Sequence, residues 1–105
     1  PPNMVLQCYF DSDVALADVN VDGNVDVVAT IPERQELNVW FQLQDDRFLE
    51  ATSFATGAPA TRLVVADLDE DGQPDVATAN QDTGNLSILM GDAGGFVAPR
   101  TIALG

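Results

Sequence analysis

The sequence predicts an all-β fold built from two similar units, each with four antiparallel strands. Two observations favour this fold class. First, short segments rich in Val, Ile, Leu and Thr alternate with turns that carry Gly, Pro, Asp and Asn, and no segment has the period of an amphipathic helix. Second, the chain repeats itself, because Asp18 and Asp67 open nearly identical nine-residue loops 49 positions apart. A repeat of this length is typical of architectures that stack one small unit on the next.

Each unit is expected to contribute four strands. The expected strands are residues 14–17, 25–31, 37–43 and 48–54 in the first unit and residues 63–66, 74–79, 86–90 and 96–103 in the second. Turns or connectors are expected at residues 32–36, 45–46, 55–61, 82–84 and 91–95. Residues 14–17 form a continuous apolar run, which is typical of a strand buried on both faces. Residues 37–43 alternate apolar and polar side chains with period two, which predicts a half-buried strand.

The composition limits the functions that are possible. A chain of 105 residues is about the size of one small domain, and 46% hydrophobic residues are enough to build a core. The formal net charge of −13 argues against binding to nucleic acid or to anionic membrane surfaces. No apolar run approaches the roughly 20 residues that span a bilayer, so we expect no membrane insertion.

Residues that enzymes commonly use for catalysis are scarce in this chain. It has no His, no Ser or Cys with a plausible base beside it, and no Gly-rich phosphate loop. We therefore expect that the chain is not an enzyme. The single Cys8 cannot form an intramolecular disulfide, and we expect a buried thiol there rather than an intermolecular bridge.

Both nine-residue loops have the residue pattern of a calcium site. Acidic or amide side chains stand at positions one, three, five and nine, and a glycine at position six allows a sharp turn. Ca²⁺ takes roughly 6–8 oxygen ligands at about 2.3–2.6 Å, which alternate residues of a tight loop can supply. With the backbone carbonyl of position seven included, the expected ligands are Asp18, Asn20, Asp22, Asn24 and Asp26 in the first loop and Asp67, Asp69, Asp71, Gln73 and Asp75 in the second. Each chain would then bind two Ca²⁺ ions.

The two loops are not expected to bind calcium equally well. The first loop has the amide of Asn20 where the second has the carboxylate of Asp69, and Glu70, next to Asp69, adds a further charge to the second loop. Pro74 fixes its own φ and restricts the second loop before any ion binds. We therefore predict tighter binding at the second loop.

Other calcium motifs fit the sequence less well. An EF-hand needs flanking helices and a bidentate Glu at loop position twelve, where this chain has Ala29 and Thr78. Dockerin-like loops also need an acid at that position, and thrombospondin-type aspartate repeats are rich in Cys. Two acidic turns that merely face solvent are a further reading, but two such loops in register within a longer repeat argue against it.

The residues around the two loops resemble a known repeat. The run from Ala17 or Ala66 through the loop pattern D-x-[DN]-x-D-G-x-x-D into a Val-rich strand, and the Gly-rich turn before Phe96, resemble the FG-GAP or VCBS repeat. This repeat is the blade unit of integrin-α-like β-propellers, and four antiparallel strands per unit suit such a blade. The resemblance covers nearly all of residues 13–105. It implies that the two loops bind calcium and that the chain is extracellular or at the cell surface, or secreted or periplasmic in a bacterium.

The repeat also leads to an expectation about assembly. Blades are expected over residues 13–61 and 62–105, and residues 1–12 are similar to the end of a preceding repeat. Two blades cannot close a ring, and an isolated pair leaves apolar faces uncovered. We expect two to four copies of the chain to complete a propeller of about 4–8 blades. The alternative, that the chain is a piece of a longer tandem array, stays open.

The resemblance favours a binding or adhesion function, with calcium in a structural role. The ligand would be a protein or a glycan. One alternative is a non-catalytic fragment of a larger secreted protein. Another is a carbohydrate-binding lectin in which Trp40 stacks on a sugar ring. Leu89 holds the equivalent position in the second unit, which favours Trp40 as a core residue instead.

Overall fold

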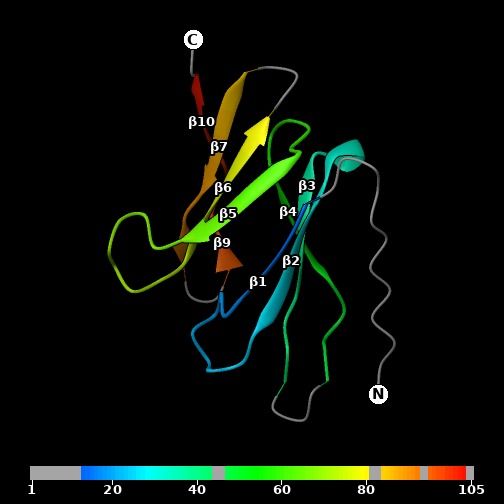
Figure 1. Ribbon diagram of the computed structural model, residues 1–105, viewed down its shortest axis with the longest axis vertical. Coiled ribbons are helices and arrows are strands. Elements are labelled where there is room, and N and C mark those ends of the chain that lie inside the picture. The colour runs from blue at the N-terminus through cyan, green and yellow to red at the C-terminus, as the bar shows by residue number, and fades with distance from the viewer. Residues whose placement is uncertain (1–12, 44–46, 81–83, 93–94, 104–105) are drawn as a thin grey trace.

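The computed structural model describes residues 13–43, 47–80, 84–92 and 95–103 (Figure 1). Within these residues the regular structure is β-strand, apart from one short 3-10 turn, η1 (Pro32–Arg34). The strands are β1 (Val14–Ala17), β2 (Asp26–Ile31), β3 (Glu36–Trp40), β4 (Thr52–Ala55), β5 (Arg62–Ala66), β6 (Asp75–Asn80), β7 (Asn85–Leu89), β8 (Gly91–Asp92), β9 (Gly95–Phe96) and β10 (Arg100–Ala103). No helix in the described part of the chain is long and apolar enough to cross a membrane.

The strands form two four-stranded antiparallel sheets and one small hairpin. The first sheet has the order β1-β2-β3-β4, and the second has the order β5-β6-β7-β10. Strands β8 and β9 pair with each other as the third, two-stranded sheet. The expectation of an all-β fold with two four-stranded antiparallel sheets is therefore confirmed.

The strand pairing repeats as closely as the sequence does. Ala17 lies opposite Asp26 in the first sheet, and Ala66 lies opposite Asp75 in the second. In the same way Trp40 faces Val27, and the equivalent Leu89 faces Val76. Because the register is conserved between the sheets, the two loops leave and re-enter their sheets at equivalent points.

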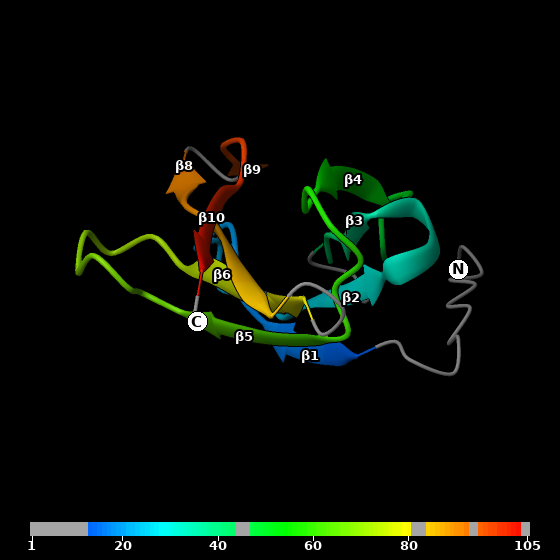
Figure 2. The same cartoon turned by 90° about the horizontal axis from the view of Figure 1, so that it is seen from above.

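The two sheets fan out from a common side of the molecule. β1 and β5 lie side by side, and the other strands diverge from them on either side (Figure 2). The main core fills the space between the sheets. Its buried members are Val19, Val28, Leu37, Val39, Leu63, Val76 and Leu89, and Phe54 and Phe96 meet edge to face at its outer end, with ring centroids 5.1 Å apart.

The first strand differs from the expectation of burial on both faces. Ala15 and Ala17 pack against the core, whereas Val14 is 39% exposed and Leu16 is 69% exposed. That expectation was wrong because a continuous apolar run predicts covered faces, while only one face of β1 has a neighbouring sheet in the described part of the structure. The strand itself lies where it was predicted.

The third strand is also shorter and more buried than predicted. β3 ends at Trp40 rather than at residue 43, and Leu37 and Val39 are fully buried on its inner side. Trp40 is 8% exposed on the other side, where it packs in a second cluster with Val27, Ala29 and Phe48. Both faces of β3 are thus covered, and Trp40 is a core residue.

The fourth strand of each sheet is interrupted. Gln42 pairs with Phe48 and Val39 with Thr52, so three residues on one side of the ladder oppose two on the other. Such an extra residue is a β-bulge, and it limits β4 to Thr52–Ala55 instead of residues 48–54. In the second sheet the predicted strand 96–103 is divided between β9 and β10. Part of the predicted turn at 91–95 pairs as β8 and β9.

The turn predicted at residues 32–36 contains η1. It ends at Gln35, whose φ of 53° lies in the left-handed region. The predicted turn at 45–46, most of the turn at 82–84, Cys8 and the segment over residues 1–12 lie outside the described residues.

Candidate metal centre

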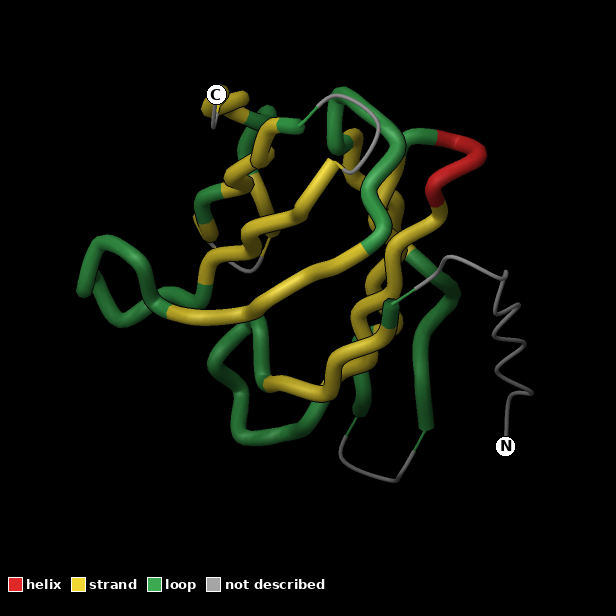
Figure 3. The backbone as a smooth tube through the Cα atoms, turned by 45° about the horizontal axis from the view of Figure 1, so that its top comes forward, coloured by secondary structure: helices red, strands yellow, loops and turns green. Residues whose placement is uncertain are grey.

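The two acidic loops join the first two strands of each sheet. One follows β1 and the other follows β5, and both extend away from the sheets (Figures 1 and 3). Two residues in each loop have positive φ: Val21 (58°) and Gly23 (91°) in the first, Glu70 (60°) and Gly72 (87°) in the second. This conformation suits glycine but is rare for a β-branched residue such as Val21, so the surrounding loop must hold it in place.

Backbone N–H groups hold the carboxylates of the first loop. Asp18 accepts hydrogen bonds from the N–H groups of Asp22 (3.1 Å) and Gly23 (2.8 Å). Asp22 in turn accepts one from the N–H of Asn24 (2.9 Å). The loop therefore folds around its own acidic side chains.

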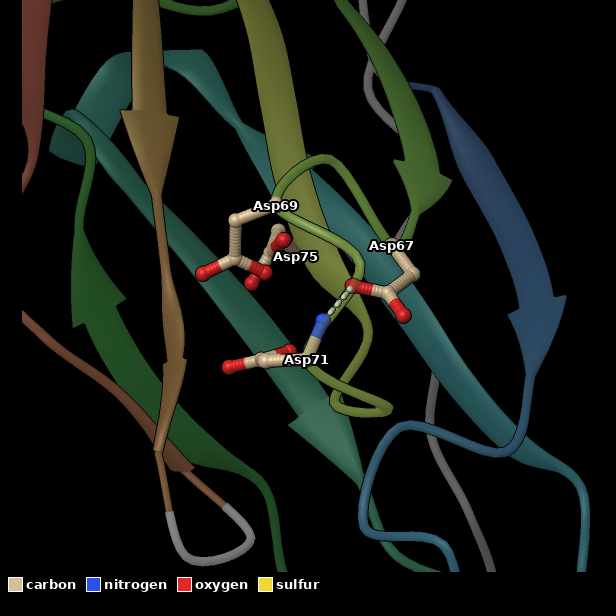
Figure 4. A group of neighbouring side chains, drawn as sticks. All are labelled: Asp67, Asp69, Asp71 and Asp75. Carbon is tan, nitrogen blue, oxygen red and sulfur yellow. Dashed lines mark hydrogen bonds between the residues drawn. The ribbon is translucent and has the colours of Figure 1, made fainter.

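The second loop has the same hydrogen bonds at the equivalent positions. Asp67 accepts from the N–H groups of Asp71 (3.1 Å) and Gly72 (2.8 Å), and Asp71 accepts from that of Gln73 (2.8 Å). Figure 4 shows the four aspartate side chains of this loop gathered around one space, with the bond from the Asp71 N–H to Asp67. The sequence repeat thus produces a repeated geometry.

The last aspartate of each loop is fully buried and anchors the loop to its sheet. Asp26 accepts from the N–H groups of Val19 (3.0 Å) and Gln42 (2.9 Å). Asp75 accepts from those of Leu68 (2.8 Å) and Gly91 (2.7 Å). Each carboxylate therefore connects the start of its loop to the chain just beyond the third strand.

The carboxylates are close enough to share one cation. Oxygen atoms of Asp18, Asp22 and Asp26 lie within 4.8 Å of one another, and so do those of Asp67, Asp69, Asp71 and Asp75. Oxygens on opposite sides of a Ca²⁺ ion are about 5 Å apart, given Ca–O distances of about 2.3–2.6 Å. A cluster of carboxylate and amide oxygens also suits a hard cation rather than one that prefers nitrogen or sulfur ligands. The donor set therefore fits calcium.

Asn20 gives a second, independent indication in the first loop. Its Oδ1 atom is buried and has no hydrogen-bond partner in the described part of the structure. A buried oxygen without a partner costs free energy, roughly 1–3 kcal/mol. A cation bound beside it would remove this cost, because the amide oxygen is a suitable calcium ligand.

The electrostatics of the second loop reflect crowded carboxyl groups. Loss of hydration, together with hydrogen bonding and charge repulsion from Asp71 and the charge of Asp75, raises the pKa of Asp69 to about 6. The backbone hydrogen bond from Gly72 lowers the pKa of Asp67 instead. Without a cation, the loop therefore holds one carboxyl group that readily takes a proton near neutral pH.

In the first loop the balance is different. The backbone hydrogen bond from Asn24 lowers the pKa of Asp22. Burial raises the pKa of Asp26, in opposition to its two backbone hydrogen bonds. The amide of Asn20 carries no charge at position three, so this loop has fewer like charges to separate.

The structure brings together all seven aspartates that the sequence singled out, in two groups. Asn20, Asn24 and Gln73 lie in the same loops, and the use of the position-seven carbonyls as ligands stays a prediction. Gln42 and Gly91, whose N–H groups bind the buried aspartates, were not predicted as part of the site. Their spacing of 49 residues matches the repeat, which is the signal that could have revealed them.

Comparison with known proteins identifies the repeat. The sequence model of the FG-GAP-like repeat family matches residues 18–78, more than half of the chain, from the start of the first loop to the strand after the second. Neither the curated proteins nor the solved structures include a significant match. The matched region contains both aspartate clusters, with the same hydrogen bonds in each. This chain belongs to the FG-GAP-like repeat family.

Proposed function

We propose that this chain is a calcium-stabilised β-propeller module that serves in binding or adhesion. FG-GAP-like repeats are generally non-catalytic structural units, and the proposed role of this chain is likewise non-catalytic. Calcium has a structural role in this proposal. The observation that carries it is the recurrence, in two loops of one chain, of aspartate oxygens within 4.8 Å of one another.

The residues of each loop explain how a bound ion would stabilise the fold. When bound, Ca²⁺ supplies positive charge that offsets the repulsion between the carboxylates. Asp26 and Asp75 connect the clusters to the sheets through hydrogen bonds from backbone N–H groups, so order in the loops is transmitted to the strands. A ligand that binds only the folded chain stabilises it by about 2.7 kcal/mol at 100 times its Kd.

We propose an extracellular or cell-surface location. The ligand residues of both loops other than the buried aspartates are half-buried or exposed. Sites of extracellular modules typically bind calcium with a Kd of about 10⁻⁴–10⁻³ M, which suits the calcium concentration outside cells. A Kd below about 10⁻⁶ M in calorimetry would contradict this part of the proposal.

Calcium titration with a charge-matched control tests the proposal. The double variant Asp22→Asn/Asp71→Asn removes one carboxylate from each loop, and the control Glu33→Gln/Glu50→Gln removes two exposed carboxylates outside the loops. The wild type and the control should bind two Ca²⁺ ions in calorimetry and unfold at a higher temperature with calcium than with chelator. The double variant should lose most of both effects. If calcium binds equally well to all three proteins, or to none, the proposal fails.

A glycan ligand is the second candidate, and a cavity beside the first loop favours it. The cavity has a volume of about 440 Å³ and is bordered by Asn20 and Asp22 of the first loop, by Gln73 of the second, and by Phe41, which also packs against the main core. Amide and carboxylate groups next to an aromatic ring suit sugar hydroxyls and the apolar face of a sugar. Trp40 cannot take the stacking role while it remains buried.

A glycan array tests this second candidate. Binding should be lost in Gln73→Ala, which keeps the backbone groups of the loop, and retained in the control Gln35→Ala, which lies in the turn after η1. If the wild-type protein binds no glycan, the glycan candidate fails and a protein ligand remains as the proposed partner.

A further inference from the structure

Each sheet has one face that points away from the main core, and large apolar residues are exposed on both of these open faces. On the first sheet the exposed residues lie in β1, because Val27, Ala29 and Trp40 on the same face are covered within the chain. On the first sheet this open face includes Val14 and Leu16 of β1, which are 39% and 69% exposed. On the second sheet it includes Val64 of β5, 61% exposed, and Ile102 of β10, 37% exposed. Val64 also borders an apolar cavity of about 320 Å³, together with Ala77 and Leu86. Apolar faces of this kind usually mark an interaction surface.

The contact between the two sheets provides a template for what could cover these faces. The inner face of the first sheet presents Ala15, Val28 and Leu37. Leu63 and Val65 of β5 pack against that face in the main core. The contact is heterologous, because the face of the first sheet that takes part is not equivalent by the repeat to the face of the second sheet that it meets.

The residues on the two open faces are the repeat equivalents of the residues that form this contact. Val64, Ala77 and Leu86 on the second sheet are equivalent to Ala15, Val28 and Leu37. Similarly, Val14 and Leu16 on the first sheet are equivalent to Leu63 and Val65. The open face of the second sheet is therefore the counterpart of the open face of the first.

On each open face the larger and smaller side chains have changed places relative to the contact within the chain, but their total volume is the same. The opposed pair Ala15 and Val28 becomes the opposed pair Val64 and Ala77. The consecutive inward residues Leu63 and Val65 become Val14 and Leu16, so that Leu and Val change places. Volume-conserving exchanges of this kind are the substitutions that packed interfaces tolerate best.

We propose that the open face of the second sheet binds the open face of the first sheet of a second copy of this chain. Val14 and Leu16 of one copy pack on Val64, Ala77 and Leu86 of the other, as Leu63 and Val65 pack within the chain. At the outer end, Phe48 of one copy meets Ile102 of the other, in place of the edge-to-face pair Phe96 and Phe54. The two open faces are thereby covered by each other.

The charges at the inner end agree with this contact. Within the chain, Asp13 accepts a hydrogen bond from the N–H of Leu63 (3.0 Å), beside Arg62. Arg62 is the repeat equivalent of Asp13, so in the contact between copies Arg62 of one lies near Asp13 of the other. The contact between copies would therefore place two groups of opposite formal charge close together.

The proposed contact is head to tail, which constrains the assembly. A heterologous contact forms a closed ring if its rotation closes and a filament if it does not. With two sheets per chain, rings of about 4–8 blades correspond to two to four copies. Either assembly leaves no open face except at the ends of a filament.

Mixing two complementary variants tests the contact. Leu16→Glu blocks the open face of the first sheet, and Val64→Glu blocks that of the second. Both residues are largely exposed, so both variants should fold with unchanged circular dichroism. Val97→Glu is the control, because Val97 is 44% exposed but lies outside the strands of both sheets. Sedimentation in calcium buffer gives the mass of each protein over a range of concentrations.

The expected masses are specific to a head-to-tail contact. The wild type and Val97→Glu should have the mass of two or more chains, while Leu16→Glu and Val64→Glu alone should each have the mass of one. An equal mixture of these two variants should form a complex of two chains, because each retains the face that the other lacks. A wild type of single-chain mass at all concentrations would overturn the proposal. A mixture that forms no complex would also overturn it.

This inference rests on the proposed function as a propeller module, but the two can fail separately. Calorimetry tests the calcium sites, and sedimentation tests the contact between copies. A chain that assembles as described without binding calcium would contradict only the proposed metal sites. A chain that binds two ions but stays a single copy would contradict only the self-association.

Discussion

The two acidic loops differ at one ligand position, although the rest of their geometry is the same. Aspartates at positions one, five and nine accept the same backbone hydrogen bonds in both loops. Position three is Asn20 in the first loop and Asp69 in the second. The Asn20 oxygen is buried without a partner, whereas neighbouring carboxyl groups and loss of hydration raise the pKa of Asp69 to about 6.

This difference separates two tasks of the loop residues. Positions one, five and nine shape the loop, because their carboxylates bind its backbone N–H groups. Position three makes none of these shaping bonds in the described part of either loop, so it can change the charge of the site without changing the fold. The first loop has less repulsion to overcome, and the second has more charge to offer a cation.

Removal of a buried aspartate should have the largest effect. Asp26→Ala or Asp75→Ala leaves two backbone N–H groups without their acceptor, at roughly 1–3 kcal/mol each. We expect a loss of about 2–6 kcal/mol in the free energy of unfolding, measured by urea denaturation in the presence of chelator. Asn20→Ala, which removes no shaping bond, is the control. A loss in chelator no larger than that of the control would contradict the assignment of position nine as an anchor.

A methyl group at Gly91 should have the next largest effect. A Cβ atom there would lie 2.2 Å from the carbonyl oxygen of Pro74, so the second loop or β8 must shift. We expect Gly91→Ala to destabilise the chain by about 1–3 kcal/mol, as overpacking typically does. Gly95→Ala is the matched control, because a Cβ atom there meets nothing closer than Phe54 at 3.7 Å. Equal melting temperatures for the two variants would show that Pro74 moves aside without cost.

Exchange of the residue at position three should change calcium affinity more than stability. We expect Asn20→Asp to strengthen binding at the first loop and Asp69→Asn to weaken it at the second, each by about tenfold, or about 1.4 kcal/mol. Calorimetry on the single variants and on the double exchange measures both sites. Identical affinities in the wild type, or no change on exchange, would refute the argument from charge.

The smallest effect should be the dependence of binding on pH. The pKa of Asp69 is raised from 3.8 to about 6 in the folded chain without metal, so this chain binds the proton more tightly than the unfolded chain does. This group therefore adds stability as the pH falls from 7 towards 5, and its proton must leave when calcium binds. Affinity at the second loop should fall by up to about tenfold from pH 6 to pH 5. In Asp69→Asn this loss of calcium affinity between pH 6 and pH 5 should disappear. If the affinity still fell to the same extent, other carboxyl groups would be responsible for the pH dependence.

Much of the fold and of the candidate site could be predicted from the sequence, because these features are local. The β-branched runs around residues 26–31 and 75–80 form strands by their own preference and pattern. The aspartate spacing places the loop residues close together, since a nine-residue turn allows few other arrangements. Because the same spacing and strand pattern occur in both repeats, a chance resemblance in a single loop does not explain them.

Other features could not be predicted because they depend on residues distant in the chain. The bulge that shortens β4 arises from the mismatch between two pairings, one at Gln42 and one at Val39. The alternation of residues 37–43 assigned Trp40 to the solvent side, and only its equivalence with Leu89 favoured the core position that contacts with Phe48 and β2 give it. Neither contact leaves a mark in the local alternation of apolar and polar residues.

The sequence by itself determined the all-β class, the two repeats and the positions of the seven loop aspartates. Only the tertiary structure decided which face of β1 is covered and which N–H groups donate hydrogen bonds to the buried aspartates. The physical reason is that strand formation and loop spacing depend on neighbouring residues, whereas burial and hydrogen bonding depend on which sheets lie opposite each other. Apolar residues such as Val14 and Leu16 have the same pattern whether a face is covered or open.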